Sequence, residues 1–154
     1  RQDFDPVLRA IRTGGSVLIY TTKASIYDKT VFNKFKLYID ECRSLTDPQA
    51  LQLIDQFKKC IGANDKDEGY YASSMLEYMR KGIVVHHGSL PLQARLILEH
   101  FTQRGFCRIC FATSTLEQGI SGAKQGRLLR NILLSMNKRS REYIRAGTDN
   151  ARSL

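Results

Sequence analysis

The sequence predicts an α/β domain whose mainly parallel sheet is covered by helices on both faces. Short apolar runs rich in β-branched residues alternate with longer segments of helical spacing, and this alternation is typical of parallel strands joined by helices. The runs are uninterrupted, as in strands that are buried on both faces. The chain has 154 residues, which is the length of one domain, and we expect a single domain over residues 1–154.

The first elements follow this alternation. Residues 5–13 carry apolar residues at helical spacing and a proline suited to the first turn, and Gly14-Gly15 ends that helix. Residues 16–21, SVLIYT, predict a buried strand because the run is β-branched and aromatic. Three helices are then expected, one over 25–42, one over 47–61 and one over 68–80.

The second half of the chain continues the pattern. Gly82 ends the third of these helices, and residues 83–86 predict a strand. Ser89 and Pro91 predict the start of a helix that continues to Phe101. Further elements are expected over 107–112 (strand), 131–136 (strand) and 139–145 (short helix).

The charge balance favours an anionic partner. Lys and Arg number 24 against 15 Asp and Glu, which gives a formal charge of +9. Such a surplus on a small domain is typical of proteins that bind nucleic acid. The alternative is a surplus spread evenly over the surface, which serves solubility only.

Other function classes find little support in the sequence. No apolar run reaches the length of about 18 residues that a membrane span needs, so no membrane partner is expected. The chain begins at Arg1 with neither a signal-peptide pattern nor Met, and we expect a fragment of a longer protein. Cys107 and Cys110 lie three apart on a predicted strand and therefore point to opposite faces, which favours reduced thiols over a metal site. Reduced thiols imply an intracellular (cytoplasmic or nuclear) location.

Polar loops follow the predicted strands. Thr22-Lys23, His86–Ser89 and Thr113–Thr115 come directly after three of them. Ligands of open parallel sheets bind at the carboxyl ends of strands, and hydroxyls, amides and ammonium groups suit a phosphate. Thr22-Lys23 can equally form a solvated turn. For the adjacent histidines, the residues alone favour one buried, hydrogen-bonded ring and one exposed ring.

Residues 82–120, GIVVHHGSLPLQARLILEHFTQRGFCRICFATSTLEQGI, carry a family resemblance. The His-His-Gly loop, the Leu-Pro-initiated helix with Arg95 and Phe101, and the strand that ends in ATSTLEQGI resemble the second RecA-like motor domain of superfamily 2 (DExH-type) nucleic-acid helicases. The resemblance implies a C-terminal motor domain that binds DNA or RNA. It also marks residues 28–81 as a helical insert, either covering helices, which we favour, or a partner-docking surface.

The resemblance assigns contacts with the nucleic-acid backbone to the strand-end loops. Arg95 either holds the His-Gly loop, which we favour slightly, or contacts the backbone itself. This interpretation requires His87 and Thr113 to lie at one edge of the sheet and to be open to solvent. The residues implied in backbone binding are Thr22, Lys23, His87, Gly88, Arg95, Thr113, Ser114 and Thr115.

The resemblance also implies a shared ATP site. Glu117 and Gly119 would face the nucleotide, and Arg145 and Arg152 would be arginine fingers on the γ-phosphate. The segment from Tyr143 to Thr148 resembles the start of the arginine-rich helix of helicase motif VI. It departs from that motif because it lacks the leading glutamine and has Thr148 in place of the middle arginine. Ser121 likewise stands where the family usually has Asn or Asp.

The sequence contains neither a phosphate-binding loop nor an acidic Mg²⁺ box at a strand end. ATP and Mg²⁺ would therefore be held mainly by an N-terminal motor domain that this chain lacks, and the chain alone should not hydrolyse ATP. The alternative function is a non-catalytic nucleic-acid or protein-binding module that has lost motif VI.

Overall fold

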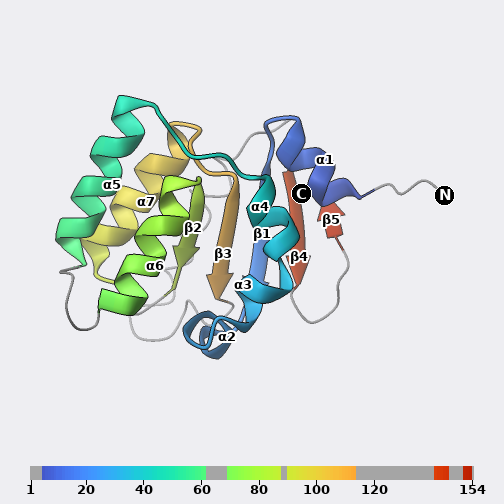
Figure 1. Cartoon of the computed structure of the whole chain (residues 1–154), viewed down its shortest axis with the longest axis horizontal. Helices are drawn as coiled ribbons and strands as arrows, with labels where there is room; N and C mark the ends of the chain where they lie inside the picture. Colours follow the sequence, from blue (N-terminus) through green and yellow to red (C-terminus); the bar gives the residue numbers. More distant parts are fainter. Residues whose placement is uncertain (1–4, 62–68, 88–89, 114–140, 146–150, 154) are drawn as a thin grey trace.

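The centre of the structure is a five-stranded sheet in the order β2-β3-β1-β4-β5 (Figure 1). The computed structural model describes residues 5–61, 69–87, 90–113, 141–145 and 151–153. Strands β2, β3, β1 and β4 are parallel to one another, and β5 is antiparallel to β4. The predicted α/β class with a mainly parallel sheet is confirmed. The strands are β1 (Ser16–Thr21), β2 (Ile83–His86), β3 (Ile109–Thr113), β4 (Arg141–Arg145) and β5 (Ala151–Ser153).

Both faces of the sheet are covered. Val17, Leu18 and Ile19 are completely buried in β1, as are residues 109–112 in β3. Successive side chains of a strand point to opposite faces, so an unbroken buried run requires cover on each face. The helices are α1 (Pro6–Arg12), α2 (Lys23–Tyr27), α3 (Thr30–Lys34), α4 (Lys36–Glu41), α5 (Pro48–Cys60), α6 (Gly69–Arg80) and α7 (Leu92–Gln103).

Helices α6 and α7 lie on opposite faces. The chain passes from β1 beyond β3 to β2 and then returns to β3, so two right-handed crossovers must use opposite faces of the sheet. Figure 1 shows α6 in front of the sheet and α7 behind it, and α5 packs against both. On the α6 face, the ring of Phe111 contacts Phe32 at 5.0 Å and Phe35 at 6.2 Å between centroids.

The prediction of one helix over residues 25–42 is wrong. The segment forms the short helices α2, α3 and α4 instead. The backbone of Lys29 is in the left-handed region at φ 67°, which no continuous helix allows. The carboxylate of Asp28 accepts hydrogen bonds from the backbone N–H of Thr30 at 2.9 Å and from its hydroxyl at 2.6 Å. Asp28 thus stabilises a turn before α3, which apolar spacing alone does not reveal.

The prediction of a short helix over residues 139–145 is also wrong. Residues 141–145 form β4, which pairs with β1 from Ser16↔Arg141 to Tyr20↔Arg145. Without β4, this side of β1 would leave a row of backbone groups without partners, and pairing satisfies them. Strand β5 was not predicted. The strand expected over 131–136 lies outside the described residues.

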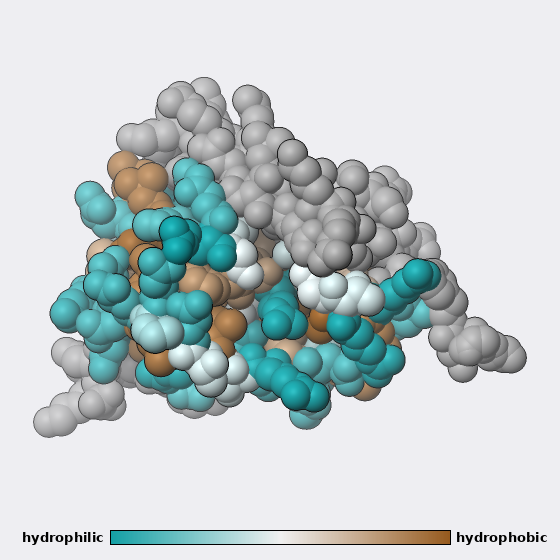
Figure 2. Space-filling view, turned by 90° about the horizontal axis from the view of Figure 1, so that it is seen from above, coloured by the Kyte–Doolittle hydropathy of each residue, from teal (hydrophilic) through white to brown (hydrophobic). Residues whose placement is uncertain are grey.

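Large apolar side chains are scattered on the described surface. Tyr27, Leu37, Leu51 and Leu96 are the large hydrophobic residues found exposed among the described ones. In the described part of the face drawn in Figure 2, hydrophobic residues are interspersed with hydrophilic ones. Among the helices that the structure describes, none is both long enough and apolar enough to cross a membrane.

Candidate functional site

The ends of the four parallel strands meet at one edge of the sheet. Thr21 of β1 pairs with Thr113 of β3, and His86 of β2 pairs with Ala112. On the other side of β1, Tyr20 pairs with Arg145 of β4. The segments that follow these strands therefore start at the same level. The structure thus brings the backbones of Thr22, His87, Thr113 and Arg145 to a common edge, which we call the carboxyl edge.

Thr22 and Lys23 form the exposed start of α2 at this edge. The Thr22 hydroxyl caps the helix, because its oxygen accepts a hydrogen bond from the backbone N–H of Ser25 at 3.1 Å. These two residues therefore begin a helix and not a turn, and both remain exposed to solvent. Lys23 is the first residue of the helix, and its side chain is exposed. Of this pair, Lys23 is the residue that presents a charge to solvent.

Tyr27 is a surface residue that the sequence analysis missed. The residue is 47% exposed, and its ring makes a T-shaped contact with the ring of His87 at 5.9 Å between centroids. The ammonium of Lys23 lies 5.6 Å from the centroid of the same ring. The signal was the spacing of four between Lys23 and Tyr27, which places both side chains on one face of a helix. The predicted helix began after Lys23, so this pairing was not seen.

His87 lies beneath Tyr27 and is buried, with 2% of its surface exposed. Burial, followed by the nearby charges of Lys23 and Arg95, lowers the pKa of His87 to about 4. The ring is therefore neutral at pH 7. The expected direct contact between this side chain and a nucleic-acid backbone is wrong for this structure, and His87 instead supports Tyr27.

His86 is also buried, and its exposed fraction is 0%. Neither ring nitrogen has a hydrogen-bond partner among the described residues. Burial is the main cause that lowers the pKa of His86 to about 4, followed by the charge of Arg95. The expectation of one buried, hydrogen-bonded histidine and one exposed histidine is wrong, since both rings are buried.

Arg95 lies on α7 behind the two histidines. Its side chain is 1% exposed, and Nε and Nη1 lack hydrogen-bond partners within the described part of the chain. Burial lowers the pKa of the guanidinium, because removing a charge from water is unfavourable. This burial contradicts direct backbone contact and agrees with the structural role that the sequence analysis favoured.

Thr113 is the last residue of β3 and is 1% exposed. The sequence-based interpretation required His87 and Thr113 to share one edge and to be open to solvent. The shared edge is confirmed by the strand register. The open side chains are wrong, because both are buried. The solvent exposure that the sequence-based motor interpretation required of both side chains is therefore not met, and any contact with a ligand at the carboxyl edge must come from other residues.

The two candidate arginine fingers occupy different levels of the sheet. Arg145 is the last residue of β4 and ends at the carboxyl edge. Arg152 lies on β5 opposite Tyr143, farther from that edge, because β5 is antiparallel to β4. Of the segment that resembles the start of motif VI, residues 143–145 lie on β4 and residues 146–148 lie outside the described residues. The predicted residues Gly88, Ser114, Thr115, Glu117 and Gly119 lie outside the described residues.

The cysteines of the described core are buried free thiols. Burial raises the pKa of Cys110 to about 12 and that of Cys107 well above its usual value. Thiols with such pKa values are protonated at pH 7 and are poor nucleophiles and ligands. Within the described ranges, no three His, Cys, Asp or Glu residues are grouped closely enough to hold a metal ion.

Comparison with known proteins finds no family model and no curated protein that matches the chain. The similarity of residues 82–120 to the helicase pattern therefore depends on these residues alone. The structure adds one relation between them. The two strands of that segment, β2 and β3, are direct neighbours in register from Ile83↔Ile109 to His86↔Ala112.

Proposed function

We propose that this chain is the second, RecA-like motor domain of an ATP-dependent nucleic-acid helicase or translocase of the cell interior. The observation that carries the proposal is the arrangement at the carboxyl edge. Strands β2 and β3, the two strands of the helicase-like segment, are neighbouring and parallel, and both end beside the exposed Lys23 and Tyr27. ATP and Mg²⁺ would be held mainly by an N-terminal motor domain.

Lys23 and Tyr27 supply the chemistry for a single strand of DNA or RNA. An ammonium group is a common ligand of backbone phosphates, and an exposed tyrosine ring is a common platform for stacked bases. The T-shaped contact between the rings of Tyr27 and His87 fixes the orientation of the Tyr27 ring. His87, Arg95 and Thr113 then shape the edge from within, and they do not contact the ligand with their side chains. The net charge of +9 favours binding of a polyanion to the chain as a whole.

Binding of a fluorescent single-stranded oligonucleotide tests the role of the carboxyl edge. We expect Lys23→Ala to weaken binding and to reduce the slope of log K against log salt by about 0.7, the value for one lost phosphate contact with a single strand. Tyr27→Ala should weaken binding with little change in this slope. The matched control is Lys58→Ala, an exposed lysine on α5. An equal effect of Lys23→Ala and Lys58→Ala would contradict a site at the carboxyl edge.

The motor function has a separate test. When the chain is joined to its N-terminal motor domain, nucleic acid should stimulate ATP hydrolysis. Arg145→Ala should then lower kcat by about 10³-fold, because arginine fingers contribute at least that much. Arg152→Ala should have the smaller effect, since Arg152 lies farther from the carboxyl edge. Normal hydrolysis by Arg145→Ala would contradict the assignment of Arg145.

The second candidate is a non-catalytic nucleic-acid or protein-binding module. The observation that favours it is β4, since residues 141–145 form a strand where the motif VI helix was expected to begin. This candidate would be supported if the joined protein bound nucleic acid through Lys23 but did not hydrolyse ATP.

A further inference from the structure

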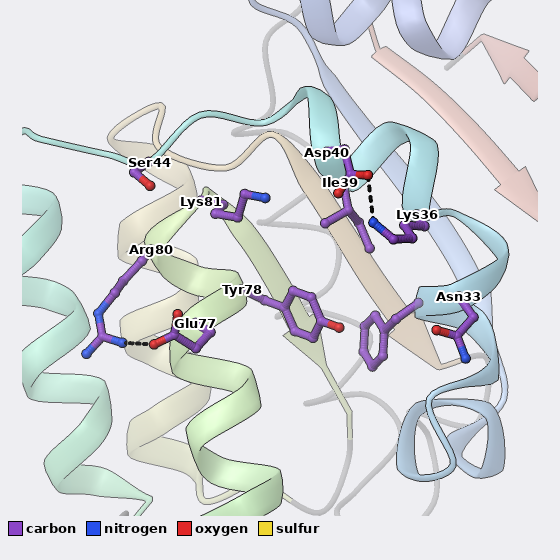
Figure 3. A pocket seen from close by; sticks show the side chains of 10 residues that line it. Asn33, Lys36, Ile39, Asp40, Ser44, Glu77, Tyr78, Arg80 and Lys81 are labelled. Carbon is purple, nitrogen blue, oxygen red and sulfur yellow. Dashed lines mark hydrogen bonds and ion pairs between the residues drawn. The ribbon is translucent and has the colours of Figure 1, made fainter.

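A second concave site lies on the α6 face of the sheet, between α4 and α6, and we call it the α4–α6 cleft (Figure 3). Its volume is about 380 Å³. The floor is apolar, with the rings of Phe32 and Tyr78 stacked at 4.6 Å and the side chain of Ile39 buried beside them. At one end, the backbone N–H of Leu45 donates to the carbonyl of Arg80 at 2.7 Å and fixes the rim. The cleft thus has a preformed apolar floor.

Most of the charges around the cleft are already paired. Lys36 binds Asp40 at 2.8 Å along α4, and Arg80 binds Glu77 at 2.7 Å along α6. Figure 3 shows the Arg80–Glu77 pair on the side of α6 that faces away from α4, whereas Lys81 extends toward α4. The Lys81 ammonium has no ion pair or side-chain hydrogen bond among the described residues, although its charge helps to lower the pKa of the Asp40 carboxylate. The cleft therefore combines an apolar floor with one positive charge that no carboxylate binds directly.

We propose that the α4–α6 cleft binds an acidic segment of a partner protein. An apolar side chain of the segment lies on the Phe32–Tyr78 ring pair, and a neighbouring carboxylate forms an ion pair with Lys81. The side chains of Asn33 and Ser44 line the same cleft and can bond the backbone of the segment. The proposal does not depend on the motor function, because it uses no residue of the carboxyl edge.

The charges favour a peptide over a nucleic acid at this place. Apart from Lys81, the charges that line the cleft form the pairs Lys36–Asp40 and Arg80–Glu77, so the cleft offers one positive charge and not the row of charges that the phosphates of a polynucleotide bind. A single carboxylate needs only the one charge of Lys81. Lys81 also lies just before β2, at the end of the sheet opposite to the carboxyl edge. A protein partner and a nucleic acid can therefore be bound at the same time.

Titration calorimetry with short peptides tests the proposal. The probes are acetylated, amidated pentapeptides of Gly and Ser that carry one Phe and one Glu, separated by zero, one or two residues. At least one should bind, and replacement of its Glu by Gln should weaken binding about tenfold, because an ion pair with a half-buried lysine is lost. This comparison needs no protein variant, so it cannot fail through misfolding.

Reversing the charge of Lys81 and that of the peptide then tests whether the peptide binds in the α4–α6 cleft. Lys81→Glu should abolish binding of the Glu peptide and allow binding of the same peptide with Lys in place of Glu. Lys58→Glu, on α5, should change neither. The proposal is overturned if no peptide of the panel binds, if the Glu and Gln peptides bind equally, or if Lys58→Glu has the effect expected of Lys81→Glu. Displacement of the peptide by a single-stranded oligonucleotide would overturn it as well, since the cleft would then accept a polyanion.

Discussion

At the scale of residues, three buried polar side chains distinguish the carboxyl edge. His86, His87 and Arg95 expose 2% or less of their surfaces. Nucleic acid is bound by charges that solvent can reach, so these residues act by holding the edge in place. Apolar patterning cannot reveal this, because a His-His pair after a strand gives the same sequence whether its rings are open or covered. The exposed Tyr27 could have been predicted from its spacing to Lys23, whereas the burial of His87 could not.

The two histidines make stability depend on pH. Their pKa values are lowered from 6.5 to about 4 in the folded chain, so between these values the unfolded chain binds more protons. The free energy of unfolding should therefore fall as the pH drops from 7 to 4, by about 3 kcal/mol for each histidine. Urea unfolding at a series of pH values measures this. His87→Gln should reduce the dependence, because it removes one of the two buried imidazoles. Equal pH dependence in the two proteins would contradict the burial of His87.

Gly82 is required where α6 turns into β2. Its φ is +80°, and a Cβ there would lie 2.7 Å from the carbonyl oxygen of Phe106. We expect Gly82→Ala to lower the free energy of unfolding by at least about 2 kcal/mol, because conformational strain and a backbone clash add together. Gly14→Ala is the control, since Gly14 has a similar φ of +83° but open space around it, and it should cost about 1 kcal/mol. If chemical denaturation gave the same loss of unfolding free energy for both variants, the predicted clash with the carbonyl of Phe106 would be contradicted.

At the scale of elements, the predictions of helices and strands that are correct depend on local signals, which are helix caps for the helices and short apolar runs for the strands. Asp5 with Pro6 and Asp47 with Pro48 start α1 and α5 where the sequence predicts them. Strands β1 and β2 have the predicted bounds because their apolar runs are short and end at polar residues. The two wrong predictions, a helix over residues 25–42 and a helix over residues 139–145, have causes that apolar spacing does not show. The Asp28 turn interrupts an otherwise helical pattern, and β4 forms because β1 offers it a partner.

The cap of α5 provides a test at this scale. The carboxylate of Asp47 accepts a hydrogen bond from the backbone N–H of Gln49 at 2.8 Å. Asp47→Ala should lower the free energy of unfolding by about 1 kcal/mol, which is typical for the loss of a helix cap. Asp55→Ala on the same helix removes only an exposed pair with Lys59 and should cost less than about 0.5 kcal/mol. Thermal unfolding of both variants measures the difference, and a larger loss in Asp55→Ala would contradict the capping role.

At the scale of the whole molecule, the sheet separates two candidate surfaces. The carboxyl edge presents Lys23 and Tyr27, while the α4–α6 cleft opens on the α6 face with Lys81 toward the other end. The sequence predicts that the strand ends meet, since parallel strands joined by helices must end at one edge. It does not predict the cleft, because α4 and α6 are separated by about half of the helical insert and come together only through the sheet. The sequence left open whether residues 28–81 cover the core or dock a partner. The α4–α6 cleft favours a segment that covers the core and also offers a docking site.

The most direct measurement of the central claim is the map of amide chemical shifts during titration of the chain with a single-stranded oligonucleotide. We expect the largest shifts at the carboxyl edge, at Lys23, Tyr27 and His87, and none at Gly14 and Gly105, which lie in the turns before β1 and β3 at the opposite edge of the sheet. Shifts concentrated at those glycines or at the α4–α6 cleft, or no shifts at all, would contradict nucleic-acid binding at the carboxyl edge.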